Sequence, residues 1–349
     1  MIVNSLNIKV YEIIKCFVIG RSGSSKGVYM ETSSPEEIGL NLVKVTDESN
    51  NSVLAGGLFK ASSYYINNYV NGSYAYGVSR KFGVAWPSMR VLDVSPDGKS
   101  LAYCTRMNGQ DNVMVRSTGT QGVATQRTFR NVHSFSWGSD GNIYFSDNNG
   151  RNYYICSVNA EKGSMMNQLT NGVVTDTNPM LSSDGNMLFF QRMSSGGPSI
   201  WALNRKDGTL TSCARGFMPC LIKDEPNAFY CVRNSTSGRS EIWYVDFVNG
   251  KESLILSDEN RSFTHPRLSP DGKWIVCVGN SVSSISKKSN LDIFVVRTDG
   301  TRLTQLTYHP ADDMSPVFSA DGRGIFFISS RANERQSYNV WRMNFNPDM

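Results

Sequence analysis

Short apolar runs alternate with polar turns through the second part of the chain. Near-continuous apolar runs of about four residues fit β-strands that are covered on both faces. A polar turn that contains Asp, and usually Gly, lies just before each run. The pattern therefore predicts one β-sheet unit that is repeated six times. The six runs are Leu101–Cys104, Ile143–Phe145, Met187–Phe190, Ala228–Cys231, Trp274–Cys277 and Gly324–Phe327.

The turn aspartates fix the length of the repeat. Ser95-Pro96-Asp97-Gly98 is a clear copy of the turn, and Lys223–Asn227 is a degraded one. Successive aspartates are separated by 43, 44, 40, 47 and 50 residues. A period in the forties is typical of one four-stranded propeller blade. The sequence thus predicts an all-β, six-bladed β-propeller. The turn positions are Asp97, Asp140, Asp184, Asp224, Asp271 and Asp321.

Further strand and turn signals lie inside each repeat. A third strand is indicated by a recurring order of four residues: β-branched, bulky, any residue, apolar. Ile242–Val245 is an example of this order. Asp207-Gly208 and Asn249-Gly250 indicate the hairpin that follows, because both residues of such pairs accept positive φ. A proline often opens the first strand, five residues before the turn Asp. These prolines are Pro179, Pro219, Pro266 and Pro316.

The sixth repeat stops after its third strand, Val340–Phe345. A ring that ended there would have an unpaired strand edge. We therefore expect an N-terminal strand near residues 40–45 to complete the last blade and close the ring. Residues 1–36 are interpreted as a flexible segment or a degraded targeting region, and residues 37–349 as the propeller. The blades are expected near residues 88–132, 133–174, 175–215, 216–262, 263–309 and 310–349.

The composition fits a folded protein and narrows the range of partners. Of the 349 residues, 40% are hydrophobic and 19% are charged, as in a globular chain. The net charge of +5 comes from scattered Lys and Arg, so nucleic acid is not an expected partner. No apolar stretch reaches the roughly 18 residues of a membrane-spanning helix, and Lys9, Glu12 and Lys15 interrupt any signal-peptide core. The seven cysteines include no CxxC pair. Cys104, Cys231 and Cys277 lie at nearly the same place in three repeats and are interpreted as buried apolar side chains.

The repeat resembles the TolB-type propeller, which is built from WD40-like PD40 repeats. Blade five matches the pattern most closely, from Pro266 through Ser269-Pro270-Asp271-Gly272-Lys273 to Leu306-Thr307. The resemblance covers about residues 88–349, and the first 87 residues look too short for the separate N-terminal domain of TolB. It implies a periplasmic or cell-envelope adaptor that binds other proteins. The motif is specific for the fold and only weakly specific for function, because propellers host many activities.

One face of the ring is expected to carry the binding site. Strands alternate in direction, so the connections after the second and fourth strands of each blade share a face. These connections, such as residues 106–112, 194–199 and 279–291, are expected to be long and variable. Variable loops on a rigid scaffold usually carry binding, so we place the site on this face and at the channel mouth. The candidate ligand-binding residues are His265, His309, Asp312, Asp313, Asp176, Arg106, Arg192, Arg233 and Arg331.

These candidates have alternative interpretations. His265, His309 and His133 with an Asp would suit a divalent metal, but they come from different blades, so no metal is predicted. The four arginines recur eight to ten residues after the turn Asp. One interpretation is a cationic ring that binds an anionic ligand, and the other is that each arginine makes hydrogen bonds within its own blade. A recurring position in the repeat favours hydrogen bonds within the blade. The Tyr-rich segment 62–86 either recognises a peptide or sugar or covers blade one.

The sequence contains no recognisable catalytic motif. A nucleophile elbow, an HExxH pair and a phosphate-binding glycine loop are all missing from it. We therefore expect a monomeric, non-enzymatic envelope protein without a cofactor, which binds a protein or peptide. The alternative is a carbohydrate-binding protein or a metal-dependent polysaccharide lyase. A third, weaker hypothesis is a regulatory propeller that acts beside a peptidase on another chain.

Overall fold

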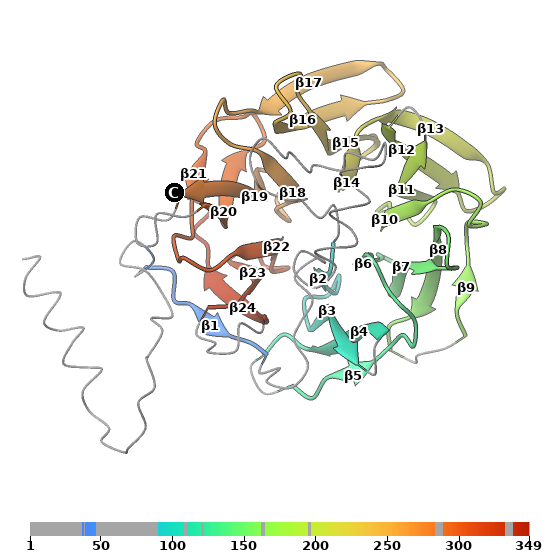
Figure 1. Ribbon diagram of the computed structural model, residues 1–349, viewed down its shortest axis with the longest axis horizontal. Coiled ribbons are helices and arrows are strands. Elements are labelled where there is room, and N and C mark those ends of the chain that lie inside the picture. Colours follow the sequence, from blue (N-terminus) through green and yellow to red (C-terminus); the bar gives the residue numbers. More distant parts are fainter. Residues whose placement is uncertain are drawn as a thin grey trace, which may run out of the picture. The chain divides into compact units, whose positions relative to one another are not determined.

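The described strands form a ring of six antiparallel sheets with four strands each (Figure 1). A computed structural model describes residues 37, 39–46, 90–107, 110–119, 122–161, 165–194, 197–282, 289–331 and 338–348. These residues contain no α-helix, and the ring belongs to the unit formed by residues 31–349. The prediction of an all-β, six-bladed propeller is confirmed. Within the described ranges, no helix has the length and apolar character needed to cross a membrane.

The blades follow one another along the chain. Blade 1 consists of β2 (Leu92–Val94), β3 (Ser100–Met107), β4 (Gln110–Ser117) and β5 (Thr125–Gln126). Blade 2 consists of β6 (Phe135–Trp137), β7 (Asn142–Asn148), β8 (Tyr153–Asn159) and β9 (Asn167–Gln168). Blade 3 consists of β10 (Asp176–Leu181), β11 (Met187–Ser194), β12 (Gly197–Asn204) and β13 (Leu210–Arg215).

The remaining blades repeat this order, with one exception at the end of the ring. Blade 4 consists of β14 (Phe217–Ile222), β15 (Glu225–Asn234), β16 (Ser240–Asp246) and β17 (Lys251–Leu256). Blade 5 consists of β18 (Phe263–Leu268), β19 (Trp274–Val282), β20 (Ser289–Arg297) and β21 (Thr304–Gln305). Blade 6 consists of β22 (Asp313–Phe318), β23 (Gly324–Ser329), β24 (Asn339–Asn344) and β1 (Val43–Lys44), so its outermost strand comes from near the start of the chain.

The repeated turn is held by its own side chains. In blade 1 the Ser95 hydroxyl donates to Asp97 Oδ1 at 2.6 Å and accepts from the Ser100 amide at 2.9 Å. Asp97 Oδ1 also accepts from the Lys99 amide at 3.1 Å. Gly98 takes φ of +73°, which a residue with a Cβ rarely adopts. The same serine–aspartate pair occurs at Ser182–Asp184, Ser269–Asp271 and Ser319–Asp321, which explains why this turn recurs.

The prolines of blades 3 to 6 lie at irregularities in the innermost strands. The residue before each proline has positive φ, between 51° and 55°, and the strand register shifts there. Proline has no amide hydrogen, so it fits where the ladder is already interrupted by a bulge. A bulge also redirects the side chain next to it, and here that side chain belongs to a strand at the centre of the ring. The four residues are Asn178, Met218, His265 and Ser315.

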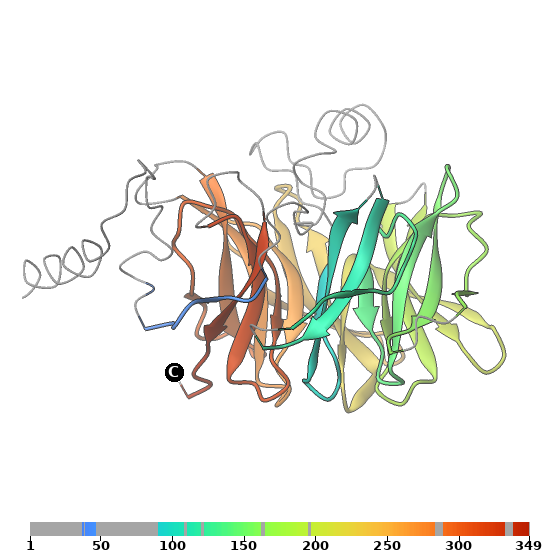
Figure 2. The same cartoon turned by 90° about the horizontal axis from the view of Figure 1, so that it is seen from below.

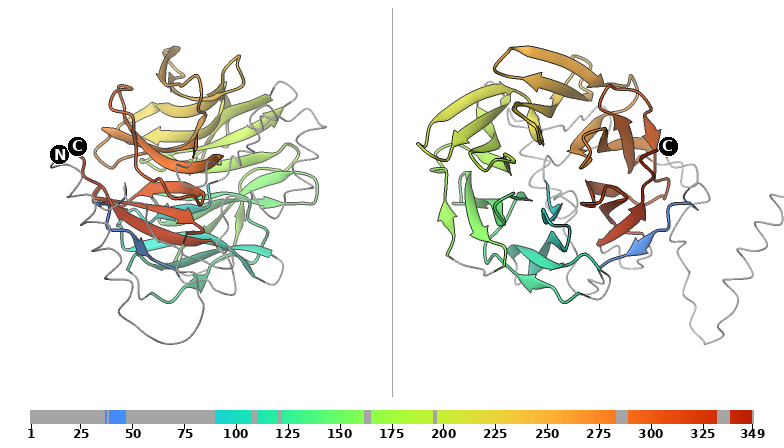
Figure 3. Two further views of the ribbon diagram at one scale, coloured as in Figure 1. Left: turned by 60° about the vertical axis from the view of Figure 1, so that its left-hand side comes forward. Right: turned by 180° about the vertical axis from the view of Figure 1, so that it is seen from behind.

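The N-terminal strand closes the ring, as predicted. β1 pairs with β24 through Val43 opposite Arg342 and Lys44 opposite Trp341. Figures 1 and 3 show the two strands side by side, although they lie near opposite ends of the chain. On either side of β1, the Asn344 amide donates to the Leu40 carbonyl at 2.7 Å and the Val45 amide to the Val340 carbonyl at 2.8 Å. One hydrophobic cluster joins blades 5, 6, 1 and 2, so packing continues across the point of closure.

Several connections are shorter than expected. Residues 106–112 and 194–199 were expected as long loops, but pairing continues to Met107–Gln110 and Ser194–Gly197, which leaves two-residue connections. The apolar runs mark the buried middle of each strand, whereas backbone pairing continues into polar residues. The links after fourth strands do vary, from the single residue 216 to the eight residues 127–134. Figure 2 shows the strands running between the two faces that carry these connections.

We call the face with the connections after second and fourth strands the link face. Two sequence hypotheses fall outside the described residues, namely the Tyr-rich segment 62–86 and the targeting interpretation of residues 1–36.

Candidate functional site

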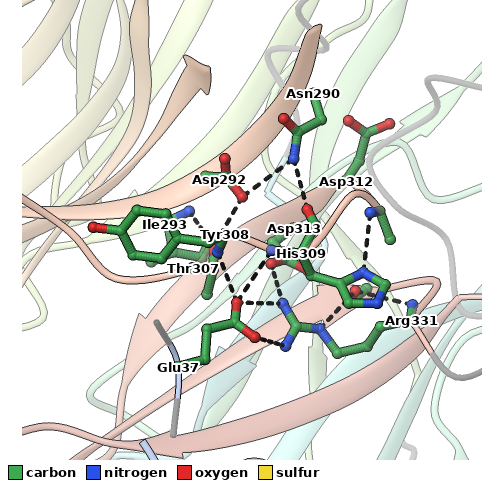
Figure 4. A network of polar contacts seen from close by, with 12 residues as sticks. Glu37, Asn290, Asp292, Ile293, Thr307, Tyr308, His309, Asp312, Asp313 and Arg331 are labelled. Atoms are coloured by element: carbon green, nitrogen blue, oxygen red, sulfur yellow. Dashed lines mark hydrogen bonds and ion pairs between the residues drawn. The ribbon is translucent and has the colours of Figure 1, made fainter. Parts of the chain in front are cut away.

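Four predicted site residues come together where blade 5 meets blade 6, on the link face (Figure 4). His309 and Asp312 lie in the link between β21 and β22, Asp313 begins β22, and Arg331 follows β23. Two carboxylates that the sequence did not single out join them. Glu37 lies just before the closing strand, and Asp292 lies on β20. We call Glu37, Asp292, Asp313 and Arg331 the latch cluster.

Arg331 is the centre of the latch cluster. Its guanidinium lies 3.0 Å (Nη1) and 3.2 Å (Nη2) from the two Glu37 carboxylate oxygens, and it also pairs with Asp313. All three side chains are fully buried. The guanidinium carbon lies 5.3 Å from the Phe327 ring centroid and 6.0 Å from that of Trp341. Buried Arg–carboxylate pairs with such support hold elements in register, and here they join the N-terminal segment to blade 6.

The same carboxylate of Glu37 reaches the link of blade 5. Glu37 Oε1 accepts from the amides of Tyr308 at 2.7 Å and His309 at 3.3 Å. His309 Nδ1 in turn accepts from the Ala311 amide at 3.0 Å, and Asp312 Oδ1 accepts from the Leu291 amide at 2.8 Å. His309 and Asp312 therefore shape the link itself.

Asp292 is surrounded by hydrogen-bond donors. Its carboxylate accepts from Asn290 and Thr307, both at 3.3 Å, from Gln305 at 3.1 Å and from the Ser281 hydroxyl. Burial, together with the nearby charge of Asp313, raises the pKa of Asp292 to about 8. Burial also raises the pKa of Asp312 to about 6 and raises the pKa of Asp313. The described part of the blade 5–6 junction thus contains more carboxylates than cations, and Asp292 holds a proton at neutral pH.

This excess of carboxylates predicts a pH dependence of stability. The folded protein keeps the Asp292 proton up to about pH 8, whereas an unfolded Asp releases it near pH 3.9. Between these values the folded state binds more protons, so the free energy of unfolding falls as pH rises. We expect a decrease on the order of a few kcal/mol from this group. In Asp292→Asn, denaturant titrations from pH 4 to 8 should show a clearly flatter dependence.

The exposed turn residue Asp299 serves as the control, because its pKa is lowered by hydrogen bonds from Thr301. Asp299→Asn should leave the slope between pH 5 and 8 as it is. An unchanged slope in Asp292→Asn would show that Asp292 does not hold a proton in the folded state.

The other three predicted arginines lie in their own blades. Arg192 Nε lies 2.7 Å from Asp176, and Arg233 Nη2 lies 2.7 Å from Glu252. Arg106 Nε lies 2.8 Å from Asp111 and is more exposed. Arg192 and Arg233 also lie over the third-strand tryptophans Trp201 and Trp243, at 4.9 and 5.1 Å. Each arginine thus has a carboxylate partner within its blade, and Arg233 also donates to the Arg215 carbonyl at 3.1 Å.

The three histidines do not meet. His265 is buried on β18, where its Nδ1 lies 3.0 Å from the Thr264 hydroxyl. His309 lies in the link before β22, and His133 stacks on Tyr153 with ring centroids 4.2 Å apart. Among the residues that the structure describes, no three His, Cys, Asp or Glu side chains gather as metal ligands.

Sequence reasoning missed Glu37 and Asp292 for different reasons. Glu37 lies outside the repeats, three residues before the expected closing strand, and nothing local indicates its partner 294 residues away. Asp292 could have been noticed, because it is a carboxylate between Leu291 and the apolar run Ile293–Val296 of the third strand of blade 5.

No protein-family model matches the chain. It is 25% identical over 197 residues to a TolB homologue of Chlorobium luteolum, a match that covers 56% of this chain and 33% of that protein. The structure of TolB from Acinetobacter baumannii aligns with a TM-score of 0.53 and 16% identity, covering 74% of this chain and 63% of that one. An oligogalacturonate lyase from Vibrio parahaemolyticus aligns with a TM-score of 0.52 and 12% identity, covering 75% and 93%.

These likenesses bear mainly on the fold. The matched part spans a third of the curated TolB homologue, and identities of 12% and 16% to the solved structures show shared architecture alone. The repeat motif, the six-sheet ring and the match in sequence nevertheless agree with one another. The described part of the chain is a TolB-like six-bladed β-propeller.

Proposed function

We propose that this protein is a non-enzymatic binding or adaptor protein of the cell envelope, which recognises a protein or peptide partner through the link face and the channel mouth. The observation that carries the proposal is the likeness to TolB proteins, in sequence as well as in fold. A closed ring provides a rigid scaffold, and the links differ in length from blade to blade. Such links are where binding usually resides.

Exposed apolar side chains on the link face are available for contact with a protein partner. Phe129 and Val173 lie in links that follow fourth strands, and Val282 ends the second strand of blade 5. Their exposed fractions are 71%, 73% and 70%. Apolar side chains with this exposure gain stability when a partner covers them, and aromatic residues are enriched in interfaces. The latch cluster holds the blade 5–6 part of this face in place.

Site-specific photo-crosslinking tests the proposal. A photoreactive residue at Val173, on the link face, is compared with one at Val248, in the opposite-face turn after β16. Both valines are exposed, at 73% and 61%, so a photoreactive group is similarly accessible at the two positions. In envelope fractions, Val173 should give a discrete protein adduct and Val248 should give none. Equal adducts at both positions, or none at either, would contradict recognition through the link face.

Carbohydrate binding is the second candidate, because the oligogalacturonate lyase shares this fold. The same link face would carry it. A glycan array with the intact protein distinguishes the two: saturable binding to an acidic oligosaccharide, together with no protein adduct at Val173, would favour the carbohydrate function over the adaptor function.

A further inference from the structure

A small polar cavity lies among the innermost strands at the centre of the ring. Its volume is about 10 Å³, which is enough for a single small bound species. The residues around it come from blades 1, 5 and 6, and none belongs to the latch cluster. They are Arg90, Leu92, His265, Arg267, Ser315 and Pro316.

Three polar atoms around this cavity have no hydrogen-bond partner among the described residues. They are Arg90 Nε, Arg267 Nη1 and Ser315 Oγ. Arg90 is 3% exposed, Ser315 is 5% exposed, and the Arg267 side chain is 12% exposed. A buried donor without a partner is destabilising, and more so when it is charged. Three such groups around one cavity indicate that something accepts their hydrogen bonds.

The charges around the cavity do not balance. Arg90 donates to the Pro219 carbonyl and, at 3.5 Å, to the Met180 sulfur, neither of which is charged. Arg267 pairs with Asp93. Among the described residues, Asp93 is also the one carboxylate whose charge raises the pKa of Arg90. Two guanidinium groups therefore share one carboxylate, which leaves one positive charge in excess.

The single carboxylate already accepts hydrogen bonds from three donors. Asp93 Oδ2 accepts from the Trp137 amide at 2.9 Å, and Oδ1 accepts from the Val94 amide at 3.0 Å as well as from Arg267. Burial, then repulsion by Arg267, lowers the pKa of Arg90 to about 9, so Arg90 is still charged at neutral pH. An uncompensated buried charge is strongly destabilising unless a counter-charge lies beside it.

We propose that this channel cavity binds one small monovalent anion of halide size, with chloride as its representative. The unpartnered groups are two guanidinium N–H groups and one hydroxyl, which are the donors that an anion accepts from. The small volume favours a monatomic anion over the larger sulfate or phosphate. The bound anion neutralises the excess charge and joins blades 1, 5 and 6 at the axis of the ring. This inference is independent of the partner bound on the link face.

The test uses the full chain and halides as probes. Urea unfolding is measured against chloride concentration, with gluconate added to keep the ionic strength constant. The free energy of unfolding should rise with the logarithm of chloride concentration above the dissociation constant. Crystals soaked in bromide should give an anomalous peak between Arg90, Arg267 and Ser315. A flat chloride response, or no bromide peak there, would overturn the proposal in favour of an ordered water.

A pair of serine variants separates anion binding from general stability. Ser315→Ala removes one proposed donor, so the chloride affinity should fall about tenfold, as expected for a hydrogen bond to a charged group. Ser136→Ala is the matched control, because Ser136 is also buried on an innermost strand with an unpartnered hydroxyl but does not line the cavity. An equal loss of chloride response in both variants would also overturn the proposal.

Discussion

Replacing Arg331 with methionine should lower the free energy of unfolding by about 3–5 kcal/mol. The substitution leaves Glu37 and Asp313 buried without their cation, because both carboxylates pair with this guanidinium and are fully inaccessible. Methionine keeps much of the side-chain volume, so the loss reports on charge and hydrogen bonding. Urea titration followed by tryptophan fluorescence gives the free energy.

Arg106→Met is the control for this loss. Arg106 lies near the end of the second strand of blade 1 and pairs with Asp111, but its side chain is 47% exposed. An exposed ion pair contributes about 0–1 kcal/mol, so the control should change little. Similar losses in the two variants would mean that the latch cluster contributes no more than a surface pair.

Replacing Trp274 with alanine should cost about 3–5 kcal/mol. Trp274 begins β19 and is 1% exposed. Its ring meets Phe345 nearly at right angles with centroids 5.7 Å apart, and its Nε1 donates to the Pro347 carbonyl at 3.1 Å. The substitution therefore opens a cavity and removes a contact between blade 5 and the residues after β24. Thermal and urea unfolding both measure the loss.

Trp274→Phe separates the two contributions. It keeps an aromatic ring near Phe345 but cannot donate to Pro347. We expect a loss of well under half that of the alanine variant, since most of the buried apolar surface remains. If phenylalanine cost as much as alanine, the hydrogen bond to Pro347 would outweigh the packing.

The fold could be predicted from the sequence because its signals are local and repeated. Asp97 and four of its counterparts each accept a hydrogen bond from the amide two residues further on, so these copies of the turn indicate the same local structure. The closing strand could be inferred from the missing fourth strand of blade 6. The lengths of the connections could not be inferred, because the backbone pairing at Met107–Gln110 is not marked by any apolar pattern in the sequence.

The candidate site was predictable only in part. His309, Asp312, Asp313 and Arg331 lie together because they follow strands of adjacent blades, which the repeat makes visible. Glu37 does not belong to a repeat, so its pairing with Arg331 required the three-dimensional structure. The channel arginines Arg90 and Arg267 occupy different positions relative to the turn Asp in their blades, and therefore gave no recurring signal.

The shared sixth blade has a consequence for the order of assembly during translation. The ribosome makes Val43 about three hundred residues before its partner Arg342. At roughly 5–20 residues per second, the first-made strand waits on the order of tens of seconds for the last-made one. Blades 1 to 5 each consist of consecutive strands, so they can fold as they emerge. The circle itself can be completed only once β24 has left the exit tunnel.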